Sequence, residues 1–546
     1  MNIFQNKPKF YMPFLLAFVL SVGMAIGVKM VELEKRPASI FTLNLGSDNK
    51  ISQIIDFIDR KYVDSVDTEK LIELGINGVI KNLDPHTAYV PARDFELMNE
   101  PLKGNFEGIG IEFNIVSDTI VVISPISGGP SEKLGIRSGD RIVKIEKEIV
   151  AGIGITTKDV INKLRGKKGS TVIVDIFRRG KKQLIAYGIE RDKIPINSLE
   201  VAYMVDDETA YMKLSRFAST TQEEFEKGLS DMLRRGMKKL ILDLRGNPGG
   251  YLSAAQSISD EFLPDNKLIV YTEGKGQPKQ ELLASAKGSF ETGKLVILID
   301  EGSASASEIV AGAIQDWDRG VVIGRRSFGK GLVQEQSEFT DGSALRLTVA
   351  RYYTPTGRCI QKPYSKGRSA YDREVWTRYE KGEYLSKDSI QINDTLSFLT
   401  PAGRLVYGGG GIIPDVFVPI DTTGASSYLN KIFYTGVIHR FAFQYSDSKR
   451  GKLHEEYMTK DNFISEYEVS ESTFSDFVNY ADENEVEKNW QLIWKSQDRI
   501  KNNLKALIAR QLWGNEGYYP IFNQNDATIK KAIEYMRNKD LVLNVD

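Results

Sequence analysis

Three serines and one lysine in the stretch 295–334 have the types and the order that nucleophilic catalysis requires. Ser303, Ser305 and Ser307 follow an apolar run, and Lys330 lies between two glycines further on. A serine hydroxyl attacks a carbonyl efficiently only when a neighbouring base takes its proton. Lysine can be that base when burial lowers its pKa from about 10.4 to roughly 7–8. The pattern predicts a serine nucleophile and a lysine base.

The elements that flank these residues would place the serine at the edge of a sheet. Residues 295–299 and 321–323 are apolar runs typical of strands, and apolar residues between them recur at helical spacing: Ile309, Val310, Ala313, Ile314 and Trp317. We expect the helix to begin near Ser305. Its first free backbone N–H groups would then be able to stabilise an oxyanion beside the serine hydroxyl.

Three other interpretations of the same residues stay open. Ser305 and Glu308 fit an S-x-x-E capping box, which needs no chemistry. Residues 324–330 copy most of the phosphate-binding pattern G-x-x-x-x-G-K, but Gly331 replaces the serine or threonine that would hold magnesium, and the alternation that follows predicts a strand. Lys330 would also fit an exposed surface lysine, which is the usual place for this residue type.

The sequence GSASASEIVAGAIQDWDRG, followed by FGKGLVQ, resembles the active-site signature of the C-terminal processing proteases, also called tail-specific proteases. These enzymes use a Ser–Lys dyad. The resemblance implies that Ser305 is the nucleophile, that Lys330 is the general base and that Gln334 helps to position the lysine. It also places Asp316 near the site as a supporting residue.

A second segment, DLRGNPGG at residues 243–250, ends an apolar strand pattern in a glycine turn. The family resemblance implies that Gly249 or Gly250 supplies one oxyanion donor and Ala306 the other. A glycine turn made only for packing is the alternative. Alternating strand and helix patterns from about residue 194 predict a layered α/β core, and the resemblance implies the crotonase/ClpP-like type.

Residues 102–190 combine short strand patterns, one helical pattern and tight glycine turns, which favour a small barrel. The sequence Gly108-Ile109-Gly110-Ile111 resembles the carboxylate-binding loop of a PDZ domain. Backbone N–H groups in such a loop can hold a C-terminal carboxylate while the neighbouring strand edge pairs with the peptide. A glycine hairpin without a ligand is the alternative. Arg165 is a candidate sensor of bound peptide, although an exposed basic turn also fits.

The N-terminal part combines an apolar segment with a helical region. Tyr11–Val28 carries no charge over eighteen residues, which predicts a membrane anchor or a secretory signal. Residues 51–80 have helical periodicity and lead to LDPHTAYV, a segment that also resembles these proteases. His86 in that segment is a candidate catalytic residue, but a histidine after Asp-Pro is far more often a turn residue.

The sequence predicts an α/β (α+β) multidomain protein. Its division is an anchor or signal (1–30), an N-terminal helical region (31–100), a PDZ domain (101–190), a protease core (191–425) and a C-terminal helical region (426–546). The stripe in the last region, which we expect in a core or a subunit contact, consists of Ile493, Ile500, Leu504, Leu507, Ile508 and Leu512. The charged insertion 362–402 has no role that the sequence reveals.

Composition limits the function classes. With 546 residues, 41% apolar content and a net charge of −1, the chain is long enough for several domains and offers no electrostatic case for nucleic acid. Its single cysteine, Cys359, excludes an internal disulfide. No metal, nucleotide or other cofactor is implied.

Together with the family resemblance, these patterns predict a serine endopeptidase that selects protein or peptide substrates by their free C-termini. The charges around the apolar segment do not fix its orientation, and the resemblance implies a body that faces the periplasm on an inner-membrane anchor or is exported. The terminal helical regions offer contacts for a homo-oligomer. One alternative is a catalytically silent peptide-binding scaffold of the same fold. Another is a Ser-His-Asp hydrolase, which would need His86, His439 or His454 beside Ser305.

Overall fold

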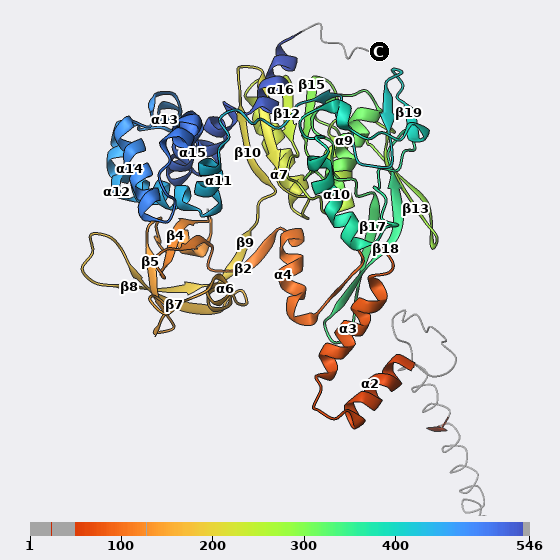
Figure 1. Ribbon diagram of the computed structural model, residues 1–546, viewed down its shortest axis with the longest axis horizontal. Coiled ribbons are helices and arrows are strands. Elements are labelled where there is room, and N and C mark those ends of the chain that lie inside the picture. The colour runs from red at the N-terminus through yellow and green to blue at the C-terminus, as the bar shows by residue number, and fades with distance from the viewer. Residues whose placement is uncertain (1–22, 25–49, 127, 539–546) are drawn as a thin grey trace, which may run out of the picture. The chain divides into compact units, whose positions relative to one another are not determined.

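The computed structural model describes residues 23–24, 50–126 and 128–538 (Figure 1). The chain forms two units, residues 1–75 and 76–546. The helices α2 (Lys50–Lys61) and α3 (Thr68–Ile80) confirm the helical pattern of residues 51–80. Apart from residues 23 and 24, the predicted anchor Tyr11–Val28 lies outside the described residues. Within the described ranges, every helix is too short or too polar to span a bilayer.

Residues 105–195, for which the sequence predicts a small barrel, form an open sheet and a separate pair of strands. Its strands run in the order β3-β4-β5-β7-β8, with β6 paired to β5, and a separate pair joins β2 to β9. In β7, Val172, Val174 and Ile176 are fully buried and alternate with more exposed residues, so one face of the sheet forms the core. The elements are β2 (Asn105–Gly108), β3 (Ile111–Ile115), β4 (Ile120–Pro125), α5 (Pro130–Lys133), β5 (Arg141–Ile145), β6 (Glu148–Ile149), α6 (Thr157–Leu164), β7 (Thr171–Phe177), β8 (Ile185–Glu190) and β9 (Asp192–Pro195).

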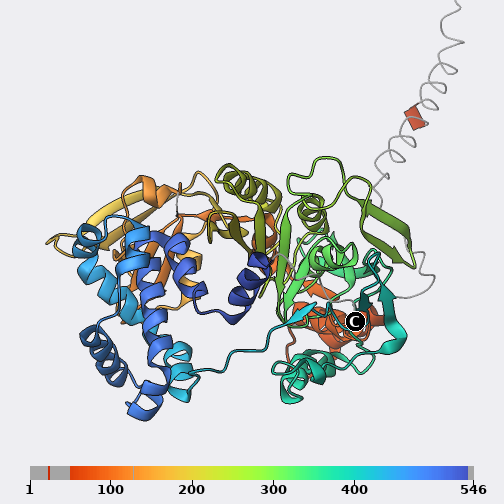
Figure 2. The same ribbon diagram turned by 90° about the horizontal axis from the view of Figure 1, so that it is seen from above.

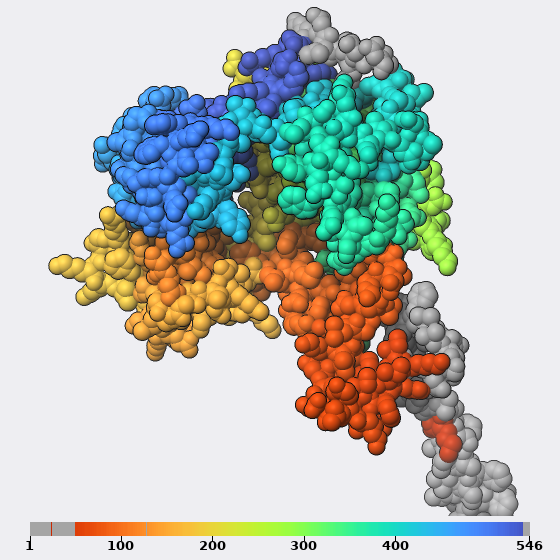
Figure 3. Space-filling model, in the orientation of Figure 1, coloured from red at the N-terminus to blue at the C-terminus, as the bar shows by residue number. Residues whose placement is uncertain are grey.

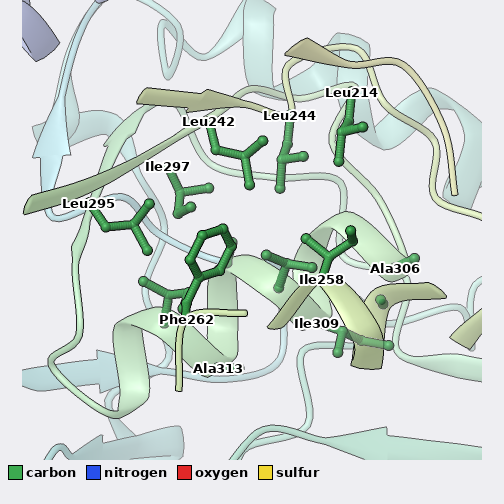
Figure 4. Close-up of a cluster of buried hydrophobic side chains, with 14 of the residues drawn as sticks. Leu214, Leu242, Leu244, Ile258, Phe262, Leu295, Ile297, Ala306, Ile309 and Ala313 are labelled. Carbon is green, nitrogen blue, oxygen red and sulfur yellow. The ribbon is translucent and has the colours of Figure 1, made fainter. Parts of the chain in front are cut away.

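A six-stranded sheet carries the candidate site. Its order is β10-β11-β12-β15-β16-β21, and every neighbouring pair after β10–β11 is parallel. Strands β12 and β15 are runs of almost fully buried aliphatic residues, which is typical of parallel strands with both faces covered. On one face of the sheet these residues pack against helices (Figure 4). The elements are β10 (Leu199–Met204), β11 (Thr209–Leu214), α7 (Thr221–Arg234), β12 (Lys239–Asp243), α8 (Leu252–Asp260), β15 (Lys294–Ile299), α9 (Ala306–Asp316), β16 (Val321–Gly324) and β21 (Val416–Phe417).

A second, antiparallel sheet carries the lysine end of the predicted dyad. Its order is β1-β18-β13-β14, and β17 pairs with β18. Between this sheet and β21 the chain forms a helix and a short hairpin, of which all but the second hairpin strand lies within the insertion 362–402. The elements are β1 (Ala88–Val90), α4 (Ala92–Lys103), β13 (Leu268–Gly274), β14 (Gln277–Leu283), β17 (Leu332–Glu338), β18 (Ala344–Tyr353), α10 (Arg368–Glu380), the 3-10 turns Lys387–Ser389 and Asp394–Leu396, β19 (Ser397–Leu399) and β20 (Leu405–Tyr407).

The C-terminal helices fall into two groups. Helices α11 to α15 share one core, which contains the predicted apolar stripe on α15, and this cluster contacts the PDZ region through an ion pair of Arg510 with Glu112 at 3.3 Å (Figure 3). Helix α16 instead packs on the six-stranded sheet, on the face opposite to α9 (Figure 2). The elements are α11 (Ser427–Tyr434), α12 (Val437–Glu456), α13 (Lys460–Glu466), α14 (Glu471–Glu483), α15 (Trp490–Asn523) and α16 (Ala527–Arg537).

Candidate active site

The three serines after β15 differ in what their hydroxyls contact. Ser303 Oγ donates to the carbonyl of Leu244 at 2.8 Å, and Ser307 Oγ donates to the carbonyl of Asn247 at 2.9 Å. Both of these side chains are fully buried. Ser305 is partly exposed; its oxygen faces the N–H of Glu308 in a capping box, but its hydroxyl donates to no acceptor within the described ranges. Of the three, Ser305 therefore has the hydroxyl that is free to react.

Ser305 lies on a sharp turn between β15 and α9, as predicted. Its φ of 55° and ψ of −115° are rare for a residue other than glycine and cost of order 1–3 kcal/mol. Neighbouring contacts hold this conformation, because the N–H of Ala304 donates to the carbonyl of Asn247 at 3.0 Å. The N–H of Ala306, the first residue of α9, donates to no acceptor in the part of the chain that the structure describes. That N–H is available to an oxyanion.

Glu308 joins the serine turn to the lysine loop. Its Oε2 accepts the backbone N–H groups of Ser305 at 2.8 Å and Lys330 at 2.9 Å. Its Oε1 accepts the N–H of Gly329 at 2.7 Å and the hydroxyl of Ser327 at 2.5 Å. Complete burial raises the pKa of Glu308 to about 7, although these four donors favour the ionised form. The capping interaction predicted from S-x-x-E is thus one part of a larger hydrogen-bond clamp.

Tyr352, at the end of β18, spans the same two segments from the other side. Its hydroxyl lies 2.7 Å from the carbonyl oxygen of Lys330 and 3.1 Å from that of Ser305. The side chain is almost fully buried, and burial raises the pKa of its hydroxyl well above the usual value. Glu308 and Tyr352 therefore fix the backbones of Ser305 and Lys330 relative to each other.

The amine of Lys330 is directed by Gln334. Nζ donates to Oε1 of Gln334 at 3.0 Å, and Nε2 of Gln334 donates to the carbonyl of His86 at 2.5 Å. Burial and the nearby guanidinium of Arg346 lower the pKa of Lys330, which favours the neutral amine that a general base requires. No hydrogen bond between Nζ and the Ser305 hydroxyl occurs among the described residues. Hydrogen bonds of this kind are often long in free enzymes and shorten around the substrate.

His86 contributes its backbone carbonyl to this arrangement, and its ring points elsewhere. Nε2 of the ring lies 2.7 Å from the hydroxyl of Tyr371 in α10. Burial and the charge of Lys330 lower the pKa of His86 to about 4, so the ring is neutral near pH 7. His439 and His454 lie in α12, within the helical cluster. The structure therefore offers no histidine hydrogen-bonded to Ser305 among the residues it describes.

The turn after β12 meets the serine turn directly. A Cβ added to Gly249 would lie 2.7 Å from Cβ of Ser305 and 2.9 Å from the nitrogen of Ala306, so only glycine fits this position, which has a φ of 98°. The N–H of Gly249 donates to Oδ1 of Asn247 at 2.9 Å. The N–H of Gly250 has no acceptor in the described parts of the chain. The two oxyanion candidates thus differ in that Gly250 has the free donor.

Asp316 lies at the last residue of α9, about 16 Å along the helix axis from Ser305. It forms a fully buried ion pair with Arg358 at 2.6 Å. Its other oxygen accepts the N–H and hydroxyl of Thr356 at 3.0 and 2.7 Å. The residue predicted to support the site therefore holds the loop after β18 and does not contact the dyad.

The predicted carboxylate loop precedes β3, the edge strand of its sheet. The backbone N–H groups of Ile109 and Gly110 donate to no acceptor within residues 50–126 and 128–538. Gly110 has a φ of 73°, which favours glycine. Arg165 forms an ion pair with Glu100 of α4, and its guanidinium lies 4.8 Å from the ring centroid of Phe106. Arg165 therefore contacts α4 and the β2 strand that follows it.

The segment around Lys330 differs from a phosphate loop and is covered by the insertion. Strand β17 begins at Leu332, so the predicted strand after Lys330 is confirmed where a phosphate loop would need a helix. The insertion covers the lysine loop: Arg378 donates to the carbonyl of Ser327 at 2.7 Å, and Nζ of Lys362 lies 3.9 Å from the ring centroid of Phe328. Sequence reasoning missed these contacts, the role of Tyr352 and the full role of Glu308. No local pattern marks them.

Known families match four parts of the chain. Peptidase family S41 matches residues 208–367, the PDZ domain family matches residues 108–187, and the N-terminal domain of the activating protease CtpB matches residues 28–93. A family of unknown function matches residues 428–514.

Individual relatives extend these matches. The carboxy-terminal processing protease CtpB of Bacillus subtilis is 33% identical over 385 residues, which cover 68% of this chain and 78% of the relative. The carboxy-terminal-processing protease of Bartonella bacilliformis is 38% identical over 317 residues, which cover 57% and 72% of the two chains. The solved structure titled photosystem II D1 C-terminal processing protease aligns with a TM-score of 0.35 and 24% identity, covering 68% of this chain and 93% of that one. With its PDZ domain and its S41 peptidase core, this chain belongs to the carboxy-terminal processing protease family.

Proposed function

We propose that this protein is a serine endopeptidase in which Ser305 is the nucleophile, Lys330 is the general base and the PDZ domain selects substrates by their C-terminal tails. The observation that carries the assignment of the nucleophile is the free, partly exposed hydroxyl of Ser305, since Ser303 and Ser307 are buried and hydrogen-bonded. Membership of the carboxy-terminal processing proteases supports the reaction class.

The reaction follows from the groups around Ser305. Its Oγ attacks the scissile carbonyl carbon and passes its proton to Nζ of Lys330. The N–H groups of Ala306 and Gly250 would receive the developing oxyanion, because both lack another acceptor in the described structure. Lys330 then returns the proton to the leaving amine, and a water molecule hydrolyses the acyl-enzyme with the same lysine as base. Gln334 keeps Nζ oriented between these steps.

A covalent probe tests the nucleophile assignment. A fluorophosphonate reacts with an activated serine hydroxyl and adds a fixed mass to it. We expect peptide mapping by mass spectrometry to place the adduct on Ser305, with the labelling rate lowered at least tenfold in Lys330→Ala. An adduct on Ser303 or Ser307, or equal labelling without the lysine, would contradict the assignment.

Tail recognition is proposed from the free N–H groups of Ile109 and Gly110 beside the edge strand β3. A substrate tail would add to β3 as a strand and place its carboxylate in this loop. We therefore expect a protein substrate with a free C-terminus to be cleaved with a lower KM than the same substrate with an amidated C-terminus. The domain order also suggests that tail binding gates the site. Equal cleavage of the two substrates would count against both ideas.

We also infer a location and an architecture from the sequence. The apolar segment Tyr11–Val28 would hold the protein in the inner membrane with the body in the periplasm, or direct its export, and carbonate extraction of membranes distinguishes the two fates. The parallel sheet with α9 at its serine turn supports a core of the crotonase/ClpP-like type. A homo-oligomer through the terminal helical regions is proposed for a test by light scattering.

A further inference from the structure

The last part of the chain reaches the turn that carries the oxyanion glycines. Helix α16 lies outside the matched families, which end at residue 514. Ile529, Ala532 and Met536 pack this helix onto the face of the six-stranded sheet opposite to α9 (Figure 2). Asp526 is its N-cap residue, and Oδ1 accepts the N–H of Ile529 at 2.9 Å. The second oxygen, Oδ2, accepts Nη1 of Arg245 at 2.8 Å.

Arg245 connects Asp526 to the strand end. Its Nε and Nη2 donate to the carboxylate of Asp243, the last residue of β12, at 3.0 and 2.7 Å. Asp243 also accepts the hydroxyl of Tyr211 at 2.7 Å, and Lys213 donates to the carbonyl of Arg245 at 3.0 Å. The side chains of Arg245 and Asp526 are 17% and 19% exposed, so water screens their ion pair only in part. In this cluster two carboxylates and two cations balance in charge: Asp243, Asp526, Arg245 and Lys213.

The residues directly after Arg245 form hydrogen bonds with the turn that carries Ser305, residues 300–307. The N–H of Gly246 donates to Oδ1 of Asp300 at 2.8 Å. The carbonyl of Asn247 accepts both the N–H of Ala304 and the hydroxyl of Ser307. Gly249 then packs against Ser305 with no space for a side chain. A shift of Arg245 is therefore passed on to Gly249 through Asn247, which is fully buried, although Gly246 itself has open space around it.

We propose that Asp526 is a positioning residue for the oxyanion turn, through which the C-terminal segment holds Arg245 and thereby the N–H of Gly250 at its distance from Ser305. The inference rests on the proposed function, because it assigns that N–H to the tetrahedral intermediate. A displacement of catalytic groups by about 1 Å can cost about 100-fold in rate. Asp526 acts through Arg245, which lies five residues before Gly250 in the chain, so a smaller effect is expected.

Asp526→Asn separates this role from folding. Asparagine caps helices as well as aspartate does, so α16 keeps its N-cap while the ion pair with Arg245 loses its negative charge. Glu534→Gln is the matched control, because Glu534 lies on the same helix and its carboxylate bonds Lys531 at 3.0 Å. Asp526→Glu is the conservative variant that keeps the charge. All variants are made in the full chain and compared with the parent enzyme.

We expect Asp526→Asn to lower kcat about tenfold and to change KM less than about twofold. This fall in kcat is smaller than the roughly 100- to 1000-fold fall that removal of an oxyanion donor causes. A peptide aldehyde forms an oxyanion on the nucleophile, so its affinity should fall by the same factor. Asp526→Glu should recover most of the rate, and Glu534→Gln should match the parent enzyme.

Two results would overturn the inference: an unchanged kcat in Asp526→Asn, or an equal loss in Glu534→Gln. A KM that rises while kcat is preserved would also count against it, since that would indicate a role in substrate binding. Failure of the proposed function has a different signature, because the parent enzyme itself would then neither cleave the substrate nor bind the aldehyde.

Discussion

Replacing Glu308 by glutamine perturbs the clamp between the nucleophile and the base at a single atom. If the amide nitrogen takes the place of Oε2, it faces the N–H groups of Ser305 and Lys330, and two donors lose their acceptor. If it takes the place of Oε1, it faces the N–H of Gly329 and the hydroxyl of Ser327, which can rotate to accept. The second orientation is favoured, and it leaves one buried N–H unpaired at a cost of about 1–3 kcal/mol.

This cost sets the expected results of Glu308→Gln. For a domain of this size, the loss corresponds to a fall in Tm of roughly 2–10 °C. The unpaired N–H lies in the residue before Lys330, so relaxation of the loop would move the base, and we expect kcat to fall at least about tenfold. Calorimetry and steady-state cleavage measure the two effects. Glu301→Gln is the control, because Glu301 lies in the same turn but pairs with Arg325 at 2.9 Å.

The pH dependence of stability tests the same carboxylate independently. Burial raises the pKa of Glu308 from 4.5 to about 7, so between these values the folded chain holds a proton that the unfolded chain has lost. The stability contributed by this group is therefore complete below about pH 4.5 and is lost as the pH rises to about 7. Glu308→Gln should lack this slope. Parent-like kcat, Tm and pH slope in Glu308→Gln would refute the clamp.

Two further predictions concern the base and the glycine turn. Lys330→Met should abolish cleavage yet raise Tm near neutral pH, because burial lowers the pKa of Lys330 and the folded state therefore disfavours its charge; calorimetry that shows a lower Tm would contradict this. Gly249→Ala should reduce kcat more than about 100-fold, because the added Cβ would meet Ser305. Gly246→Ala is the control and should lose much less activity, because Gly246 also has a positive φ, of 68°, but open space around it. Equal kcat losses in the two variants would show that backbone strain alone is responsible.

The proposed dyad of Ser305 and Lys330 could be inferred from the sequence because its signals are local. Ser305 begins a helix with a clear apolar period, and Gln334 follows Lys330 by four residues, so short patterns carry all three. The PDZ sheet was predictable for the same reason, since its strands alternate and its glycines mark the turns. These features needed no knowledge of which strands are neighbours.

The contacts that hold the dyad together were not predictable in this way. Tyr352 meets Ser305 across 47 residues, and Asp526 meets Arg245 across 281 residues. A buried tyrosine in a strand and an aspartate before a helix both have ordinary local explanations, as an apolar core residue and as an N-cap. Their roles appear only when the two sheets and the C-terminal segment are brought together. For the same reason, no local pattern indicates that α16 covers the six-stranded sheet.

Cleavage of an unstructured protein with an apolar C-terminus, measured side by side for the parent enzyme, Ser305→Ala and Lys330→Ala, tests the central claim most directly. Mass spectrometry of the products identifies the cut sites, and circular dichroism shows that each variant is folded. We expect the parent enzyme to cleave this substrate and both folded variants to be inactive. Cleavage that persists in either variant would contradict the Ser–Lys mechanism, and a folded parent that binds the tail without cutting it would favour a peptide-binding scaffold.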